Sequence, residues 1–214
     1  MNADRIAAFY RWIEYVAFGK ALERRRFAFL SRAALSRRVL ILGEGDGRFL
    51  ARLLALNDAA WVDVVDASGS MLALARGRVP PPAAGRVRFH RRNALLAPLP
   101  GDGYDLIVTH FFLDCFSTDD AARMIARLSA ALRPGGEWIV SEFQEPSGRL
   151  ARLHARLWLF VMYAFFRLAT GLTADKLPPY STLLSAAGLV IEEQQQARWG
   201  LMVSQLWRKP GDTA

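Results

Sequence analysis

The sequence predicts an α/β fold built on a parallel, doubly wound sheet, and three observations carry this prediction. Short apolar runs alternate with helical segments between residues 39 and 143. A glycine-rich loop, Gly43-Glu44-Gly45-Asp46-Gly47, directly follows the first apolar run. The 214 residues are 52% hydrophobic and 22% charged, a balance that suits one globular domain with a sizeable core. Strands that alternate with helices in this way are typical of βαβ units.

The first elements follow from periodicity. Apolar residues between Asp4 and Leu30 recur at three- and four-residue steps, so residues 1–36 are predicted to form an N-terminal helical cap, which Gly19 divides. Val39-Leu40-Ile41-Leu42 is short and wholly apolar and ends in glycines, which predicts a buried parallel strand. Arg48 to Leu56 returns to helical spacing.

The alternation continues to residue 143. A helix is predicted from Ser68, a suitable N-cap, to Arg78, and a Pro/Gly-rich loop spans Pro80 to Gly85. A second helix is predicted over Thr118 to Leu132, before the turn Arg133-Pro134-Gly135-Gly136. The further strands are predicted at residues 61–66, 87–90, 104–109 and 137–143.

The last part of the chain predicts an insertion and a hairpin. Residues 146–176 are strongly apolar, which predicts a helical lid inserted after the fifth strand. A helix near Tyr180 to Ala187 is followed by two strands, at residues 189–195 and 201–207, joined through Arg198-Trp199-Gly200. We therefore predict a single domain, with the cap at residues 1–36 and the α/β unit at residues 37–214.

Several classes of protein are excluded. The longest apolar run, Leu157 to Phe166, is ten residues, whereas a membrane-spanning helix needs about 20. The first residues lack the pattern of a secretory signal. Cys115 is the one cysteine, so an internal disulfide and a multi-Cys zinc site are excluded and a cytoplasmic location is predicted. His90 and His154 have no metal-ligand spacing with other residues, so no metal is predicted.

The net charge of +8 is concentrated near the N-terminus. Residues 1–38 hold nine basic and three acidic side chains. Such a face could meet nucleic acid or anionic lipid headgroups, or it could be a solvated helix surface. We expect the solvated surface and no nucleic-acid partner.

The glycine loop and a later carboxylate predict a nucleoside-containing cofactor. Glycines after a strand let the backbone approach a ligand closely. Asp66 ends the next strand 19 residues after Gly47, where a carboxylate can accept hydrogen bonds from ribose hydroxyls. Glu44 and Asp46 inside the loop would repel a pyrophosphate, which disfavours NAD. S-adenosylmethionine has no phosphate and carries ammonium and sulfonium groups, so these charges favour it.

Over about residues 37–207 the chain resembles the class I S-adenosylmethionine-dependent methyltransferases. The resemblance rests on five motifs in order: Val39-Leu40-Ile41-Leu42-Gly43-Glu44-Gly45-Asp46-Gly47, Val65-Asp66-Ala67-Ser68-Gly69-Ser70-Met71-Leu72, Asn93-Ala94, Tyr104-Asp105-Leu106-Ile107-Val108 and Leu132-Arg133-Pro134-Gly135-Gly136. It implies a Rossmann-like, seven-stranded, mostly parallel sheet whose last strand is antiparallel. The chain is similar in particular to the group that methylates quinones, lipids and other small molecules.

The resemblance also implies a cofactor site. The glycines of the loop would line the methionine end and Asp66 would bind the ribose; Ala67 and Met71 would pack on adenine, with Asn93 and Ala94 at its amine. His110 and Phe111 would border the sulfonium. The full predicted set is Gly43, Glu44, Gly45, Asp46, Gly47, Asp66, Ala67, Met71, Asn93, Ala94, His110 and Phe111. Ile41 and Asn93 stand where the family usually has acids, and Glu44 could compensate for the first.

Three side chains are candidates for catalysis. His110 follows a central strand at the edge where open α/β sheets bind ligands, and imidazole accepts a proton near neutral pH. Asp114 could orient His110, act itself, or cap the helix near Thr118. Glu142 ends the fifth strand and could act as the base or form a structural ion pair. A phenol or enol acceptor would need such a base to take its proton.

The predicted function is methyl transfer to a small, apolar or aromatic acceptor at oxygen or carbon. Arg149, Arg152, Arg156 and Arg167 bracket aromatic residues in the predicted lid. One interpretation is a lid over a hydrophobic substrate drawn from a membrane surface; another, compatible with it, is a helix packed into the core of the cap. The same interleaving could stack RNA bases. An RNA or protein methyltransferase and a non-catalytic S-adenosylmethionine-binding protein therefore remain alternatives. The sequence leaves the oligomeric state open.

Overall fold

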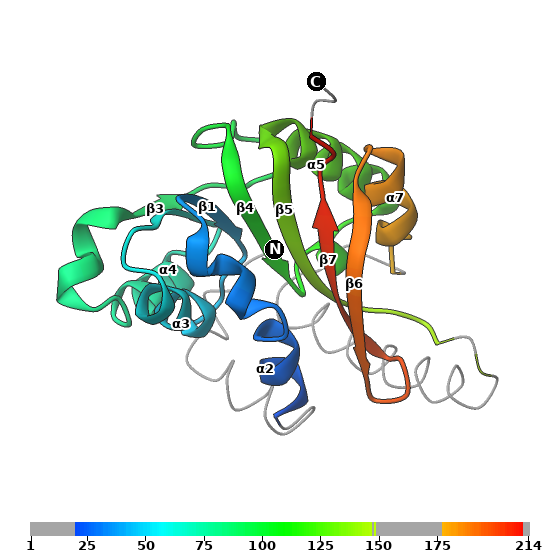
Figure 1. Cartoon of the computed structure of the whole chain (residues 1–214), viewed down its shortest axis with the longest axis horizontal. Coiled ribbons are helices and arrows are strands. Elements are labelled where there is room, and N and C mark those ends of the chain that lie inside the picture. The colour runs from blue at the N-terminus through cyan, green and yellow to red at the C-terminus, as the bar shows by residue number, and fades with distance from the viewer. Residues whose placement is uncertain (1–19, 147, 149–176, 212–214) are drawn as a thin grey trace.

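The computed structural model describes residues 20–146, 148 and 177–211. Most of the predicted cap, and the predicted lid apart from residues 146 and 148, lie outside these residues. The described chain forms one seven-stranded sheet with helices on both faces (Figure 1). The predicted Rossmann-like sheet is thereby confirmed.

The strand order is β3-β2-β1-β4-β5-β7-β6. The first five of these strands run parallel, whereas β7 is antiparallel to both of its neighbours. The bounds are β1 Arg38–Leu42, β2 Trp61–Asp66, β3 Val87–Arg91, β4 Tyr104–His110, β5 Leu132–Phe143, β6 Val190–Ala197 and β7 Met202–Arg208. β1 pairs with β2 on one side and with β4 on the other, so the order of the strands reverses direction at β1. A crevice for a ligand is expected at such a point, at the carboxyl ends of β1 and β4.

Each face of the sheet has its own hydrophobic core. The α-helices are α2 Ala21–Arg26, α3 Arg48–Leu56, α4 Gly69–Arg76, α5 Thr118–Ala131 and α7 Tyr180–Ala186. Phe49, Leu50 and Leu53 of α3 pack on one face of the sheet. Met124 of α5 and Leu184 of α7 pack on the other face. Buried helical stripes at three- and four-residue steps thus place the sheet between two helical layers.

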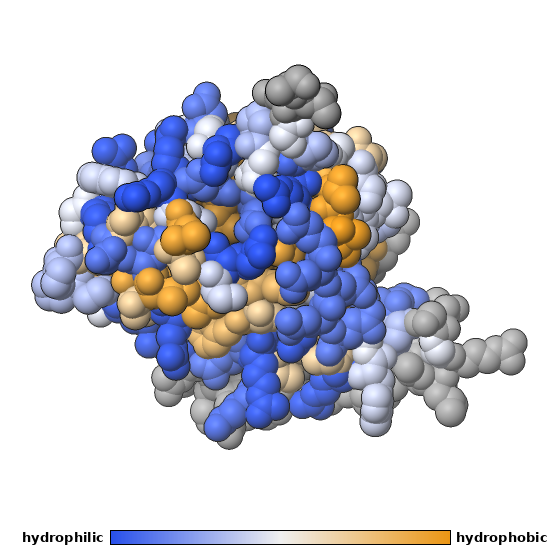
Figure 2. All heavy atoms as spheres, viewed as in Figure 1, coloured by the Kyte–Doolittle hydropathy of each residue, from blue (hydrophilic) through white to orange (hydrophobic). Residues whose placement is uncertain are grey.

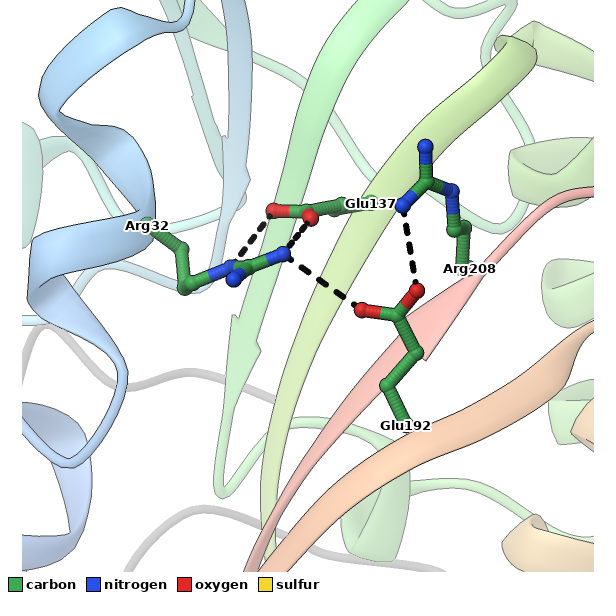
Figure 3. A network of polar contacts seen from close by, with 4 residues as sticks. All are labelled: Arg32, Glu137, Glu192 and Arg208. Atoms are coloured by element: carbon green, nitrogen blue, oxygen red, sulfur yellow. Dashed lines mark hydrogen bonds and ion pairs between the residues drawn. The ribbon is translucent and has the colours of Figure 1, made fainter.

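Ion pairs connect the segment before β1 to strands β5 and β6. A 3₁₀ helix, η2 (Leu30–Leu35), presents Arg32 to the carboxylates of Glu137 and Glu192, and Glu192 also accepts from Arg208 at 3.2 Å (Figure 3). Partly exposed ion pairs of this kind each contribute about 1 kcal/mol or less. Their main consequence is geometric, because they hold α2 and η2 across the sheet.

Several local predictions are corrected by the structure. The segment after Pro80 is a 3₁₀ helix, η3 (Pro81–Arg86), because two prolines fix φ near its helical value. The turn at residues 133–136 lies inside β5, where the register shifts so that Leu132 pairs with Tyr104 but Glu137 with Leu106. The cap of α5 is Ser117, whose hydroxyl accepts from the Asp120 N–H, and not Asp114. The predicted Ser68 cap of α4 is confirmed.

The surface is mostly hydrophilic on the face that Figure 2 shows, with a hydrophobic area near the start of β6. Val190 and Ile191 of β6 are 56% and 42% exposed there. None of the helices in the described ranges has the length and apolar character that a bilayer span requires.

Candidate active site

The glycine loop turns sharply between β1 and α3. Gly43 donates from its N–H to the Val65 carbonyl at 3.0 Å and has φ +63°. A Cβ on Gly43 would lie 2.6 Å from Cδ2 of Phe112, and one on Gly47, at φ +87°, would lie 2.5 Å from Cα of Ala75. Glycine is therefore required at both positions, for left-handed backbone and for close approach.

The two acids of the loop are used differently. Asp46 pairs with Arg48 at 2.9 Å and with Arg78 at 3.1 Å, so its charge is compensated within the protein. Glu44 is 7% exposed; its Oε1 accepts from the Leu50 N–H at 2.9 Å, whereas Oε2 has no hydrogen-bond partner among the described residues. Burial raises the pKa of Glu44 to about 7. Of the two predicted acids, Glu44 is the one whose carboxylate is left incompletely satisfied.

The second segment of the predicted site begins at the end of β2. Asp66 is half-buried, and its Oδ1 accepts from the Ser68 N–H at 2.8 Å, which fixes the carboxylate at the entrance to α4. Ala67 is exposed beside it, and Met71 is 3% exposed in the first turn of α4. These residues lie at the same sheet edge as the glycine loop, because β1 and β2 are parallel neighbours.

The segment after β3 forms a turn held by α5. The Asn93 side-chain oxygen accepts from the Leu95 N–H at 3.0 Å, and Asn93 itself is exposed. Arg127 of α5 donates to the Ala94 carbonyl at 2.9 Å. The Asn93 side-chain oxygen therefore stabilises the turn by accepting this hydrogen bond, which does not require an aspartate.

His110 ends β4 and is buried, at 6% exposure. Its Nδ1 lies 3.0 Å from Oγ of Ser141, and its ring packs edge-on against that of Phe49, with 4.8 Å between the ring centroids. Its Nε2 has no hydrogen-bond partner within the described part of the chain. Burial and the charge of Arg26 lower the pKa of His110 well below its usual value, so the imidazole is neutral. Phe111, at φ +52°, turns the chain immediately afterwards.

Glu142 holds the loop that follows β4. Its carboxylate is fully buried and accepts from the N–H groups of Phe112 at 3.1 Å, Leu113 at 2.8 Å and Asp114 at 3.3 Å. Burial and the neighbouring Asp114 raise its pKa well above the usual value. Glu142 is therefore placed to position this loop.

Asp114 completes a buried group of polar side chains under the loop. It is 5% exposed, lies 3.5 Å from Sγ of Cys115, and burial raises its pKa to about 6. Burial raises the pKa of the Cys115 thiol, and the charges of Asp114, Glu142 and Asp66 raise it further, so all three acids act on this thiol. The Tyr180 hydroxyl is buried nearby and has no hydrogen-bond partner of good geometry among the described residues.

These buried acids predict a pH-dependent stability. Their pKa values are raised in the folded state, so stability is greatest at low pH and is lost as pH rises through about 6 for Asp114 and about 7 for Glu44. For Asp114 the raised pKa corresponds to roughly 3 kcal/mol. We expect the free energy of unfolding, measured in urea, to decrease across this range, and Asp114→Asn to flatten the decrease. The same slope in Asp114→Asn as in the wild type would contradict this.

Four residues of the site were not predicted from the sequence. Arg26 of α2 is 5% exposed, and its charge acts on both Glu44 and His110. The Ser141 hydroxyl lies 3.1 Å from that of Ser204, and the Ser204 hydroxyl donates to the Arg25 carbonyl at 2.8 Å. No local pattern signals these contacts, since the residues are far apart in the chain. No three His, Cys, Asp or Glu side chains in the described part of the chain are grouped to hold a metal ion.

Comparison with known proteins agrees with this geometry. Residues 39–136 match the family described as "Methyltransferase domain". The chain is 30% identical over 150 residues to a ubiquinone/menaquinone biosynthesis C-methyltransferase of Shewanella halifaxensis, which covers 69% of this chain and 59% of that protein. The chain spans only 56% to 60% of the length of the first three curated relatives that it matches.

Solved structures share the fold. An O-methyltransferase family protein from Burkholderia thailandensis superposes with a TM-score of 0.67 at 18% identity, covering 98% of this chain and 64% of that one. The N-methyltransferase NodS from Bradyrhizobium japonicum, in complex with S-adenosyl-L-homocysteine, gives 0.63 at 18% identity, with 89% and 88% covered. At such identities the similarity shows the fold alone.

Proposed function

Because the chain belongs to the class I S-adenosylmethionine-dependent methyltransferases, we propose that it transfers a methyl group to oxygen or carbon of a small, hydrophobic or aromatic acceptor. The observation that carries this proposal is the convergence of the glycine loop, Asp66 and the loop after β4 at one edge of the sheet. A C-methyltransferase of quinones among the relatives supports the acceptor class.

The residues present fit S-adenosylmethionine. Asp66 would hold the ribose hydroxyls, Ala67 and Met71 would flank the adenine, and the Asn93–Ala94 turn would meet its amine. In residues 20–146, 148 and 177–211, Glu44 and His110 each leave a buried polar atom without a partner, as a site built for a polar ligand does. When bound, the cofactor supplies an electrophilic methyl group on a sulfonium with a good leaving group.

For the acceptor, we assign proton removal to Asp114 and positioning to Glu142. The methyl group would pass to the acceptor oxygen or carbon as the acceptor loses a proton to the Asp114 carboxylate. Asp114 is mostly ionised at neutral pH, since its raised pKa is about 6. His110 is the weaker candidate for this step, because an imidazolium would be buried beside the Arg26 cation. The burial of this region excludes water from the reacting groups.

The acceptor itself is proposed to be apolar and to come from a lipid surface. Trp199, at the tip of the hairpin between β6 and β7, is 79% exposed and follows the cationic Arg198. Tryptophan and arginine together are typical of contact with lipid headgroups. The hairpin tip lies at the end of β6, which runs parallel to β1 and β4, and so at the same edge as the site. With one cysteine, the cytoplasm stays the predicted location.

Transfer of labelled methyl groups tests the proposal. The protein is incubated with S-adenosylmethionine carrying a tritiated methyl group and, separately, with a bacterial lipid extract, total RNA or total protein. We expect label in the organic phase with the lipid extract only. Label in RNA or protein would replace the small-molecule assignment, and binding without transfer to any extract would favour a non-catalytic protein.

A further inference from the structure

Two buried acceptor atoms without partners lie around the first turn of α3. Oε2 of Glu44 and Nε2 of His110 make no hydrogen bond with any residue that the structure describes, although their side chains are only 7% and 6% exposed. Leaving a buried polar atom unpaired costs on the order of 1–3 kcal/mol. Two such atoms on side chains that contact the same helical turn indicate a ligand that supplies donors.

The backbone brings the two side chains together. β1 and β4 are adjacent and parallel, with Leu42 paired to Thr109, so Glu44 and His110 follow neighbouring strand ends. In the first turn of α3, the Leu50 N–H donates to Oε1 of Glu44 at 2.9 Å. The Phe49 ring of the same turn packs against the His110 ring, with 4.8 Å between the ring centroids.

A chain of hydroxyl groups determines which nitrogen of His110 carries the proton. Nδ1 lies 3.0 Å from Oγ of Ser141, Ser141 Oγ lies 3.1 Å from Oγ of Ser204, and Ser204 Oγ lies 2.8 Å from the Arg25 carbonyl. The carbonyl can only accept, and each hydroxyl has one proton to donate. Ser141 Oγ also lies 3.1 Å from the Arg25 carbonyl, so its single proton goes either to that carbonyl or to Ser204. In both arrangements Nδ1 must donate to Ser141. Nε2 of the neutral ring then carries a lone pair and acts as an acceptor.

The two acceptors match an ammonium group. A carboxylate oxygen and an imidazole lone pair together suit a cation with several N–H donors. Arg26, whose charge reaches both side chains, would complement a carboxylate beside that ammonium. The methionine end of S-adenosylmethionine carries these two groups on one carbon. Ile41, at 1% exposure, supplies no carboxylate from within β1.

We propose that Glu44 Oε2 and His110 Nε2 together accept the α-ammonium of the cofactor, in place of an acid at Ile41. Ser141 and Ser204 are positioning residues that keep Nε2 unprotonated. This proposal rests on the proposed function, because it requires that the cofactor bind. It makes His110 a binding residue and leaves proton removal to Asp114.

Calorimetry with two ligands tests the ammonium site. S-adenosylhomocysteine carries the amino-acid group, whereas 5′-methylthioadenosine lacks it. We expect wild-type protein to bind the first at least tenfold more tightly. Glu44→Gln and His110→Phe should each weaken S-adenosylhomocysteine by at least tenfold and leave 5′-methylthioadenosine within twofold. Ser129→Ala, a buried serine in α5, is the matched control and should change neither.

Nitrogen-15 NMR of His110 tests the tautomer without any loss of folding. We expect a protonated Nδ1 and an unprotonated Nε2 in the free protein, with the Nε2 signal shifted by S-adenosylhomocysteine and not by 5′-methylthioadenosine. Ser141→Ala should introduce the other tautomer. A protonated Nε2 in wild-type protein, or equal wild-type affinity for the two ligands, would overturn the proposal. Absence of binding by both ligands would instead overturn the proposed function.

Discussion

Asp66→Ala is expected to weaken S-adenosylhomocysteine binding more than tenfold. Asp66 ends β2 and is held at the entrance to α4 by the Ser68 N–H, at 2.8 Å from Oδ1. A charged carboxylate that accepts from ribose hydroxyls contributes about 1.5–3 kcal/mol, and about 1.4 kcal/mol corresponds to tenfold in affinity. Isothermal titration calorimetry measures the change directly.

Two further variants separate the ribose contact from local folding. Asp66→Asn keeps an oxygen for the Ser68 N–H but loses the charge, so we expect a smaller loss of affinity with unchanged thermal stability. Asp58→Ala removes an exposed carboxylate just before β2 and should leave binding unchanged. Affinity of Asp66→Ala within twofold of the wild type would remove Asp66 from the site.

Gly47→Ala is expected to have the largest effect on stability. Gly47 has φ +87° and a new Cβ would lie 2.5 Å from Cα of Ala75, which is backbone of α4 and cannot rotate away. Left-handed strain costs about 1–3 kcal/mol and overpacking of a well-filled core a similar amount. We therefore expect a loss of roughly 3 kcal/mol or more in the free energy of unfolding, measured by urea denaturation.

Gly188→Ala is the matched control for this effect. Gly188 has φ +82°, but no atom lies within 4 Å of the position that a Cβ would take there. It isolates the backbone strain, for which about 1–2 kcal/mol is expected. The difference between the two variants measures how closely α3 and α4 approach. Equal losses would show that the Ala75 contact contributes nothing.

The sheet was predictable because its signals are local. Val39-Leu40-Ile41-Leu42 became β1 with every side chain at 1% exposure or less, and the apolar run at Trp61 became β2 with the predicted bounds. Ser68 was identified as a cap because a hydroxyl at an N-cap accepts from the next turn, as it does from Met71. Alternation, glycines and capping residues act within a few positions of the chain, so a single sequence reveals them.

The inside of the site was only partly predictable. Glu44, Asp66 and His110 follow strands, and the rule that ligands bind at the carboxyl ends of parallel strands locates them. The partner of His110 is Ser141, 31 residues later, and Ser141 reaches Arg25, 116 residues earlier. Such contacts depend on how α2 and β5 meet in space. The proton that we place on Nδ1, and with it the proposed role of His110 as an acceptor instead of a base, could not be inferred without them.

The cluster of Asp114 and Glu142 illustrates the same limit. Both acids were predicted from their places after β4 and in β5, but their mutual proximity and the three N–H donors on Glu142 come from packing. We propose different functions for the two acids. Glu142, with no exposed surface, holds the loop, whereas Asp114 is the acid assigned to the acceptor.

Titration of the wild-type protein with S-adenosylhomocysteine, with NAD as the control ligand, tests the central claim most directly. The acids in the glycine loop and Asp66 at the end of β2 predict micromolar binding of S-adenosylhomocysteine and none of NAD. Binding of NAD alone, or of neither ligand by protein whose thermal unfolding is cooperative, would contradict the assignment of the cofactor and of the methyl-transfer reaction.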